Sequence, residues 1–343
     1  MKSKILITGI TGQLGSFLAE KYLLMNYSVH GIIRRHSNIN STNRIDHIFN
    51  ELNLYYGDLT DSLSIDSIIQ KVMPDILINC AAQSHVATSY DIPLYTSQVD
   101  AIGTLIILES VKKHCPTCKV VQMSTSELFG EVLETPQTEK TPFNPVSPYS
   151  IAKLYAYYIT KNYRDCYNIW SSNIICFNME SERRGSTFVT KKITEGLSEI
   201  YYKMKNSEKF NTLKLGNLNS FRDWGYCPDY ADGIIKLLEQ DNPDDIILAT
   251  NETHSIKEFI EECCKYINID IEWVGTDINE KGIDNNTGQI IVEIDKRYFR
   301  PAEVDILLGD YSKAKRILGW EPKVRFSELV KIMMKNDLKK YIN

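Results

Sequence analysis

The chain has 343 residues, of which 43% are hydrophobic and 24% charged, and its formal net charge is −5. This is the composition of a globular protein with a large core, arranged as one elaborated domain or as two lobes. The negative charge argues against a broad nucleic-acid-binding surface, so an anionic ligand would need a local arginine cluster.

The apolar run at the N-terminus, in MKSKILITGI, is short and passes directly into glycines, unlike a signal peptide. No apolar stretch reaches the length of a membrane span. We therefore expect a cytosolic protein without membrane contact, whose eight cysteines are mostly reduced. Cys115 and Cys118 form a CxxC, but no second pair lies at zinc spacing, so we predict no metal site.

Apolar strands alternate with amphipathic helices along the first half of the chain. This alternation predicts an α/β fold, a Rossmann-type doubly wound parallel sheet with right-handed crossovers. The predicted strands are Ile5–Thr8, Val29–Arg34, Leu54–Gly57, Ile76–Ala81, Lys119–Met123, Ser172–Phe177 and Ile246–Thr250; helices are predicted from Gln13, over Ile102–Lys113 and over about Pro148–Tyr167.

Around residues 180–215 and 250–343 the pattern becomes irregular, and here we expect a smaller C-terminal lobe interleaved with the sheet. The predicted division assigns residues 1–180 and about 216–250 to the Rossmann domain, and about 181–215 and 251–343 to a substrate lobe. Ligands should bind between the two, at the carboxyl ends of the strands.

A glycine motif, GxxGxxG, follows the first strand and opens a helix, which is the context of a dinucleotide-binding fingerprint. Glycines let the backbone approach a pyrophosphate, and the helix N-terminus favours its charge. A plain tight turn is the alternative interpretation. The residues expected to contact a cofactor here are Gly9, Thr11, Gly12, Gln13, Leu14 and Gly15.

The second strand ends in Arg34 and Arg35, where an NAD site usually has an acidic residue for the ribose hydroxyls. Guanidinium groups suit a 2′-phosphate, so the sequence favours NADP over NAD. Solvated surface charge is the alternative interpretation of this pair. Loops after the third and fourth strands are expected to contact the adenine, through Asp58 and Leu59, and to lie beside the nicotinamide, through Ala81, Ala82, Gln83 and Ser84.

Tyr149 and Lys153 form a YxxxK motif on the predicted helix. Residues four apart lie on one helix face, so phenol and ammonium point into the same space. The positive charge should lower the pKa of the tyrosine from about 10, as suits a general base. The strand at Lys119–Met123 runs into Thr125 and Glu127, whose oxygens improve no core and therefore indicate chemistry.

The glycine motif, STSELFG at 124–130 and SPYSIAK at 147–153 together resemble the extended short-chain dehydrogenase/reductase superfamily. Within it the chain is similar to the GDP-mannose 4,6-dehydratase family over almost its whole length. The segments that carry this resemblance include NCAAQSHVATSYDIP, FNMESERRGSTFVTKKI, LGNLNSFRDWG and RYFRPAEVDILLGDYSKAKRILGWEP.

The resemblance implies a mechanism. Tyr149 would remove the proton of the sugar's C4 hydroxyl while hydride passes from C4 to NADP⁺. Glu127 would take the C5 proton, and the C6 hydroxyl would leave as water, protonated by the same acid, before hydride returns to C6. Thr125 would hydrogen-bond the C4 oxygen, and Lys153 would tune Tyr149 and hold the nicotinamide ribose. A simple reductase needs no carboxylate at Glu127.

The resemblance also implies ligand contacts outside these motifs. The arginines of the matching segments suit a diphosphate, because a guanidinium is a bidentate donor. The polar loop from Arg34 to His47 resembles one that crosses to a neighbouring subunit, which implies a homodimer or homotetramer. The implied cofactor contacts are Tyr95, Met179 and Arg184, and the implied GDP-sugar contacts are Ser84, Asn178, Glu180, Val189, Lys192, Asn217, Arg222, Arg300 and Glu303.

Four positions depart from the family pattern: Leu14 replaces an Asp, Met179 a His, Glu182 a Pro and Tyr226 a His. If the family's His before ES acts through its backbone, Met179 can replace it; if its imidazole contacts a ligand, the pocket has changed. GDP-manno-heptose therefore stays open as a substrate beside GDP-mannose. Two functions of different classes stay open as well, an NADP-dependent nucleotide-sugar epimerase or reductase and a catalytically silent NADP-binding regulator.

Overall fold

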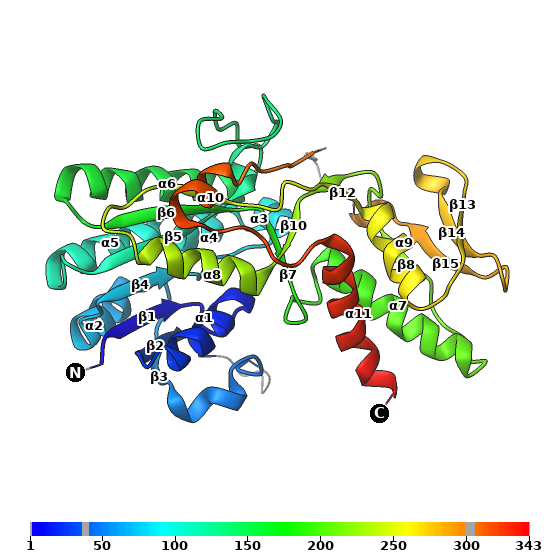
Figure 1. Cartoon of the computed structure of the whole chain (residues 1–343), viewed down its shortest axis with the longest axis horizontal. Coiled ribbons are helices and arrows are strands. Elements are labelled where there is room, and N and C mark those ends of the chain that lie inside the picture. Colours follow the sequence, from blue (N-terminus) through cyan, green and yellow to red (C-terminus); the bar gives the residue numbers. More distant parts are fainter. Residues whose placement is uncertain (1, 36–40, 299–305, 343) are drawn as a thin grey trace.

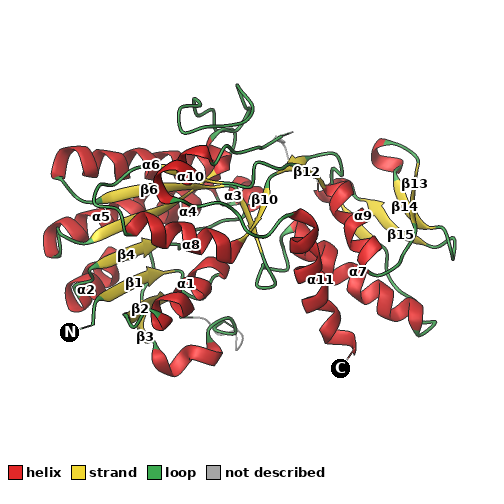
Figure 2. Cartoon of the chain, in the orientation of Figure 1, coloured by secondary structure: helices red, strands yellow, loops and turns green. Residues whose placement is uncertain are grey.

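The computed structural model describes residues 2–35, 41–298 and 306–342. A seven-stranded parallel sheet with helices on both faces forms the larger part of the molecule. A smaller lobe of helices and a four-stranded sheet lies beside one end of it (Figures 1 and 2). The predicted α/β fold with a Rossmann-type, doubly wound sheet is confirmed.

The large sheet contains all seven predicted strands, in the order β11-β6-β5-β4-β1-β2-β3, and every neighbouring pair is parallel. The strand order reverses between β1 and β4, so the loops after these two strands diverge and leave a crevice at the carboxyl edge. The strands are β1 (Lys4–Thr8), β2 (Ser28–Ile33), β3 (Asn53–Tyr56), β4 (Ile76–Asn79), β5 (Lys119–Thr125), β6 (Ser171–Cys176) and β11 (Ile246–Leu248).

Alternate side chains of the strands reach opposite faces of the sheet. Ile5 and Ile7 of β1 are buried in one core with α1, α8 and α10, whereas Leu6 is buried in the other core with α2, α5 and α6. Burial on both faces explains why the strands are almost continuously apolar. These helices are α1 (Gln13–Leu24), α8 (Cys227–Leu238), α10 (Ser312–Leu318), α2 (Ser62–Val72), α5 (Gly103–His114) and α6 (Pro148–Tyr167).

The lobe has a hydrophobic core of its own, in which three helices pack with a sheet of order β13-β14-β15-β8. A buried ion pair, from Lys191 Nζ to Asp337 Oδ1 at 2.5 Å, joins α7 to α11. The elements of the lobe are α7 (Val189–Lys205), β8 (Leu213–Leu215), α9 (Ile256–Tyr266), β13 (Ile271–Val274), β14 (Lys281–Asp284), β15 (Ile290–Ile294) and α11 (Phe326–Ile342).

Two short strand pairings lie between these parts. β7 (Asn178–Glu180) pairs with β10 (Trp224–Tyr226), and β9 (Phe221–Arg222) pairs with β12 (His254–Ser255). The predicted domain boundaries stay a prediction, and one stretch departs from them: α10, which they assign to the lobe, packs against α8 and β11 of the large sheet. Among the described residues, no helix has the length and apolar character needed to cross a membrane.

Candidate active site

Two adjoining pockets open at the carboxyl ends of the strands. The first pocket, between the ends of β1, β2 and β4, has a volume of about 560 Å³. The second pocket, which reaches the lobe, has a volume of about 380 Å³. Ser124, Tyr149, Met179 and Arg184 line both, so the two pockets are halves of one cleft.

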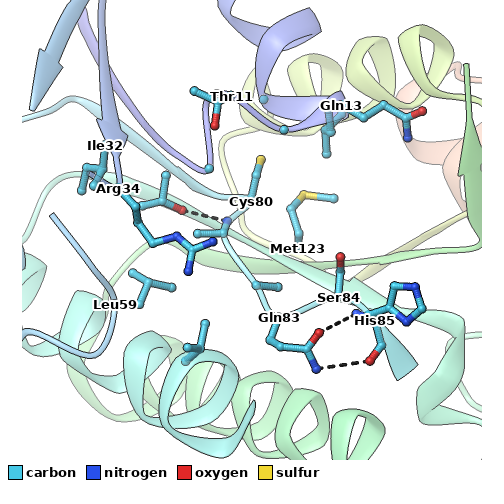
Figure 3. Close-up of a pocket in the computed structure, with 18 of the residues that line it drawn as sticks. Thr11, Gln13, Ile32, Arg34, Leu59, Cys80, Gln83, Ser84, His85 and Met123 are labelled. Carbon is cyan, nitrogen blue, oxygen red and sulfur yellow. Dashed lines mark hydrogen bonds between the residues drawn. The ribbon is translucent and has the colours of Figure 1, made fainter. Parts of the chain in front are cut away.

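Almost all residues predicted to contact the cofactor line the first pocket. Arg34 does so (Figure 3). Its guanidinium donates a hydrogen bond to the Tyr95 hydroxyl at 2.8 Å. Arg35 does not: it donates to the Tyr56 hydroxyl at 3.4 Å and lies over the Tyr56 ring. The other predicted residues that line it are Gly9, Thr11, Gly12, Gln13, Leu14, Gly15, Asp58, Leu59, Ala81, Ala82, Gln83, Ser84, Tyr95, Lys153, Met179 and Arg184.

The glycine loop brings β1 against the end of β4. Gly9 has a φ of +63°, and a Cβ there would lie 2.9 Å from the backbone nitrogen of Ala81. Helix α1 begins at Gln13, with Gly12 as its N-cap and no side chain capping it. Backbone N–H groups at such a helix end bind phosphates well, so this part of the pocket fits the pyrophosphate of a dinucleotide.

The loop after β4 is held by Gln83. Its side-chain oxygen accepts from the backbone N–H of His85 at 2.8 Å, and its amide donates to the carbonyl of His85 at 3.2 Å (Figure 3). The same amide donates to the Thr96 hydroxyl at 3.0 Å. This arrangement fixes Ser84 and His85, which line both pockets.

The end of β5 delivers a carboxylate into the cleft. Thr125 Oγ1 accepts a hydrogen bond from the backbone N–H of Glu127 at 3.2 Å, which caps the short helix Ser126–Leu128. Glu127 is buried and lines the second pocket together with Thr125 and Tyr149. The hydroxyl of Thr125 and the carboxylate of Glu127 therefore lie in the same pocket as the Tyr149 phenol.

Helix α6 places Tyr149 and Lys153. It begins at the predicted residue, because Ser147 and Ser150 cap each other reciprocally and Pro148 occupies the first turn. The backbone N–H of Tyr149 donates to Ser89 Oγ at 3.2 Å. Both side chains line the first pocket, and Tyr149 also lines the second.

The predicted lowering of the tyrosine pKa was wrong for the protein alone. Burial raises the pKa of Tyr149, and the negative charges of Asp100 and Glu127 raise it further; the Thr125 hydroxyl and the Arg184 guanidinium oppose them. Burial also lowers the pKa of Lys153, whose Nζ donates to the carbonyl of Met123 at 2.5 Å. Burial disfavours the phenolate of Tyr149 and the ammonium of Lys153. This effect on the two pKa values is larger than the effect that the two groups, four residues apart on the helix, have on each other.

Most residues predicted to contact the GDP-sugar line the second pocket. Glu180 is already paired with protein groups, because it accepts a hydrogen bond from the Thr190 hydroxyl and lies 3.1 Å from Arg184 Nε. Lys192 lies over the Tyr298 ring, 3.3 Å from its centre. The predicted residues that line the pocket are Ser84, Asn178, Glu180, Val189, Lys192, Asn217 and Arg222. Arg300 and Glu303 lie outside the described residues.

The sequence prediction missed several lining residues. His85 follows the predicted Ser84 directly, and Arg297 and Tyr298 lie at the start of the quoted segment RYFRPAEVD, so a local signal existed for each. Thr187 and Phe188 line both pockets just before α7, and they lie inside the quoted segment FNMESERRGSTFVTKKI, so a local signal existed for them too.

The departures from the family pattern lie in different surroundings. The carbonyl of Met179 accepts a hydrogen bond from the Gln13 amide at 2.9 Å, so the backbone of this residue holds a side chain of the glycine loop. Leu14 is buried beside the first pocket. Tyr226 donates to a Glu182 carboxylate oxygen at 3.4 Å, and neither residue lines a pocket. Two of the changed residues therefore contact each other.

Within the described ranges, no group of three or more His, Cys, Asp or Glu side chains is arranged to hold a metal ion.

Comparisons with known proteins identify relatives that cover almost the whole chain. The chain is 49% identical over 347 residues to a GDP-mannose 4,6 dehydratase of Drosophila melanogaster, covering 97% of this chain and 85% of that protein. It is 47% identical over 358 residues to a GDP-mannose 4,6-dehydratase of Vibrio cholerae, covering 99% of this chain and 95% of that one.

Solved structures share the fold at lower identity. A UDP-glucose 4-epimerase of Thermotoga maritima superimposes with a TM-score of 0.80 at 22% identity, covering 98% of this chain and 99% of that chain. A dTDP-glucose 4,6-dehydratase of Bacillus anthracis, solved with NAD, gives 0.78 at 22% identity, covering 98% and 97%. The family model for GDP-mannose 4,6 dehydratase matches residues 6–333. The chain therefore belongs to the GDP-mannose 4,6-dehydratase family.

Proposed function

We propose that this chain is a cytosolic, NADP-dependent GDP-mannose 4,6-dehydratase, which converts GDP-mannose to GDP-4-dehydro-6-deoxy-mannose and water. The observation that carries the proposal is the position of Glu127: its carboxylate lines the second pocket together with Tyr149 and Thr125. An epimerase or reductase has no need of that carboxylate. The names of the relatives favour mannose over the heptose.

The first pocket fits a nicotinamide dinucleotide, with the pyrophosphate at the glycine loop and the start of α1. When bound, the cofactor supplies a hydride acceptor for C4 of the sugar and a hydride donor for C6. Arg34 and Arg35 would bind the 2′-phosphate of NADP, since both lie at the end of β2 and carry permanent charge.

Tyr149 is the base for the C4 hydroxyl. Its phenolate is stabilised by the Thr125 hydroxyl and the Arg184 guanidinium, which both act to lower its pKa against the effect of burial. Thr125 is also placed to hydrogen-bond the sugar's C4 oxygen as charge develops there. Lys153 supplies positive charge from the same helix face.

Glu127 carries out the elimination. Once C4 is a carbonyl, the C5 proton is acidic, and the carboxylate removes it. The C–O bond at C6 then breaks, and the proton held by Glu127 leaves with the C6 hydroxyl as water. The buried position of Glu127 excludes solvent that would compete for this proton.

The nucleotide diphosphate would bind in the part of the second pocket formed by the lobe. Lys192, Arg222 and Asn217 line this part and supply two cations and an amide. Cations with several donors suit a diphosphate. Because these residues come from α7, β9 and the loop after β8, substrate binding would join the lobe to the large sheet.

The predicted homodimer or homotetramer belongs to the same proposal. Ile151, Tyr155 and Tyr158 lie along one side of α6 and are exposed in the single chain. Apolar side chains at this helical spacing indicate a face that another surface covers. Light scattering of the purified protein measures its mass in solution, and a monomer at micromolar concentration would contradict this part of the proposal.

Mass spectrometry tests the activity. The protein, incubated with GDP-mannose and a small amount of NADP⁺ without added reductant, should give a product lighter by one water. In D₂O the product should carry deuterium at C5, because the proton that Glu127 removes from C5 leaves with the water, and the proton that is later added to C5 comes from the solvent. GDP-manno-heptose serves as the competing substrate. An unchanged mass with both sugars would reject dehydration.

A further inference from the structure

A buried carboxylate that the proposed mechanism does not use lies behind the catalytic helix. Asp100 is 2% exposed and belongs to a π-helical turn, Gln98–Ile102, between α4 (Pro93–Ser97) and α5. This turn packs against α6, which carries Tyr149 and Lys153. Turns of this kind occur often at functional sites.

The hydrogen bonding of Asp100 is incomplete. One oxygen, Oδ1, accepts from the backbone N–H of Gln83 at 2.7 Å, next to the first pocket. The other, Oδ2, is buried without a hydrogen-bond partner among the described residues. A carboxylate kept for structure alone would have both oxygens satisfied, because an unpaired buried oxygen is costly.

Asp223 shows what such a structural carboxylate looks like in the same molecule. It is fully buried, and Oδ1 accepts from the backbone N–H and the hydroxyl of Thr250 at 2.9 and 2.7 Å. Its Oδ2 accepts from the N–H groups of Asn251 and Gly309 at 3.1 and 3.2 Å. Asp223 lines neither pocket. The contrast indicates that Asp100 is retained for another reason.

That reason is the charge on Lys153. Its Nζ is buried and donates to the Met123 carbonyl, which also accepts from the Gln122 amide at 2.9 Å. The Gln122 side-chain oxygen in turn accepts from the Asn79 amide at 2.7 Å. All these partners are neutral, so they do not balance the positive charge of a buried ammonium.

Asp100 is a buried carboxylate whose negative charge favours the charged form of Lys153. Burial lowers the pKa of Lys153, and Asp100 raises it more than the Cys80 and Cys176 thiols do. Burial raises the pKa of Cys80 to about 12 and that of Cys176 further, so both thiols are neutral. We propose that Asp100 is a positioning residue that keeps Lys153 charged and in place beside Tyr149, at the expense of stability.

The groups that face Asp100 determine the sign of its pH dependence. Lys153 and Tyr149 interact with it electrostatically from α6, the backbone N–H of Gln83 donates to it from the loop after β4, and on α5 the neutral Thr104 hydroxyl donates to its backbone carbonyl. Burial raises the pKa of Asp100 to about 6, and Lys153 moderates this rise.

Above pH 6 the carboxylate is charged and supports Lys153. The folded protein binds more protons than the unfolded chain between the ordinary pKa of 3.8 and about 6, so Asp100 lowers stability as the pH rises through this window. The stability loss is complete above it. A neutral residue at position 100 should therefore raise stability at pH 7.5 and change it little near pH 4.

The inference rests on the proposed function where it assigns Tyr149 and Lys153 to proton transfer. Its test uses Asp100→Asn, which keeps the acceptor for Gln83 and removes the charge. At pH 7.5 the variant should melt higher than the wild type by about 1–4 °C. Its kcat for GDP-mannose should fall at least about tenfold with little change in KM, and the acidic limb of the wild-type pH–rate profile near pH 6 should be lost.

Asp223→Asn is the matched control, because the amide cannot replace the second oxygen, and this variant should melt lower than the wild type. A double-mutant cycle with Lys153→Met gives a readout without cofactor or turnover. Asp100→Asn should stabilise the Lys153→Met protein more than it stabilises the wild type, since Asp100 has then lost its partner.

Additive effects in this cycle, a lower melting temperature for Asp100→Asn, or failure of that variant to fold would overturn the inference. A wild type that dehydrates no GDP-sugar would instead refute the proposed function, and the stability cycle would still report on Asp100 and Lys153.

Discussion

The two pockets of the cleft are built in different ways. The first pocket is lined mainly by residues that directly follow β1, β2, β3 and β4, four strands of one sheet. The second pocket combines the end of β5 with β7, α7, β9 and residues of the lobe as distant as Arg297. Local sequence signals therefore specify the first pocket, whereas tertiary folding of the lobe assembles the second.

This difference predicts how substitutions should behave. A change that touches only the first pocket should alter cofactor binding, and a change that touches only the second should alter substrate binding or chemistry. Residues that line both, such as Tyr149 and Met179, lie where the reaction occurs. Substitutions in each pocket test whether cofactor binding and substrate binding are separate.

The largest effect is expected for Glu127→Gln. The amide is isosteric but cannot remove the C5 proton, so net dehydration should fall by about 10²–10⁴-fold. Affinity for NADPH, followed by fluorescence titration, should stay unchanged, because Glu127 lines only the second pocket. Glu131→Gln, at an exposed residue outside both pockets, is the control. A near-normal rate of water loss would remove Glu127 from the mechanism.

Lys192→Met should act on the substrate alone. A charge-assisted hydrogen bond contributes about 1.5–3 kcal/mol, so KM for GDP-mannose should rise about tenfold or more while kcat stays similar. Lys205→Met, on the exposed end of the same helix α7, is the control. Weaker NADP binding in the Lys192 variant would show that the two pockets are not separate.

The sequence predicted the fold well where its signal was local. The helix at Pro148–Tyr167 begins and ends at the predicted residues, because a reciprocal serine cap and Pro148 define its start and Asn168, with a φ of +54°, ends it. Six of the seven strands are buried almost along their whole length, and this burial on both faces gives them an apolar pattern; the edge strand β3 is only half-buried. All but one of the predicted cofactor residues line the first pocket, and most of them directly follow strands of this sheet.

The rest depended on effects that no local pattern contains. The pKa of Tyr149 follows from burial and from the charge of Asp100, which lies 49 positions earlier in the chain. The return of α10 to the large sheet depends on Trp320, whose indole N–H donates to the Asp229 carbonyl at 2.7 Å. Neither could be predicted without the tertiary structure.

Arg35→Ala should give a moderate effect confined to the cofactor. Loss of one exposed guanidinium should weaken NADP binding several-fold, by about 1 kcal/mol, and leave NAD binding unchanged. Isothermal titration with both dinucleotides measures this, and Arg316→Ala on α10 controls for loss of surface charge. Arg35 lies outside the first pocket and bonds to Tyr56. Equal losses for the two dinucleotides would mean that Arg35 does not bind the 2′-phosphate.

The smallest effect is expected at a residue that lines both pockets. Met179 holds Gln13 through its carbonyl, which any residue would supply, so Met179→His should change kcat/KM for GDP-mannose by no more than about twofold. Gln13→Leu is the informative partner: it removes the donor to Met179 and the acceptor for the Ser181 hydroxyl, and should weaken NADP binding clearly more. A tenfold change in Met179→His would show that the side chain contacts a ligand. The preference between GDP-mannose and GDP-manno-heptose should then be measured in both proteins, because a residue in both pockets can select the sugar while its backbone holds the cofactor loop.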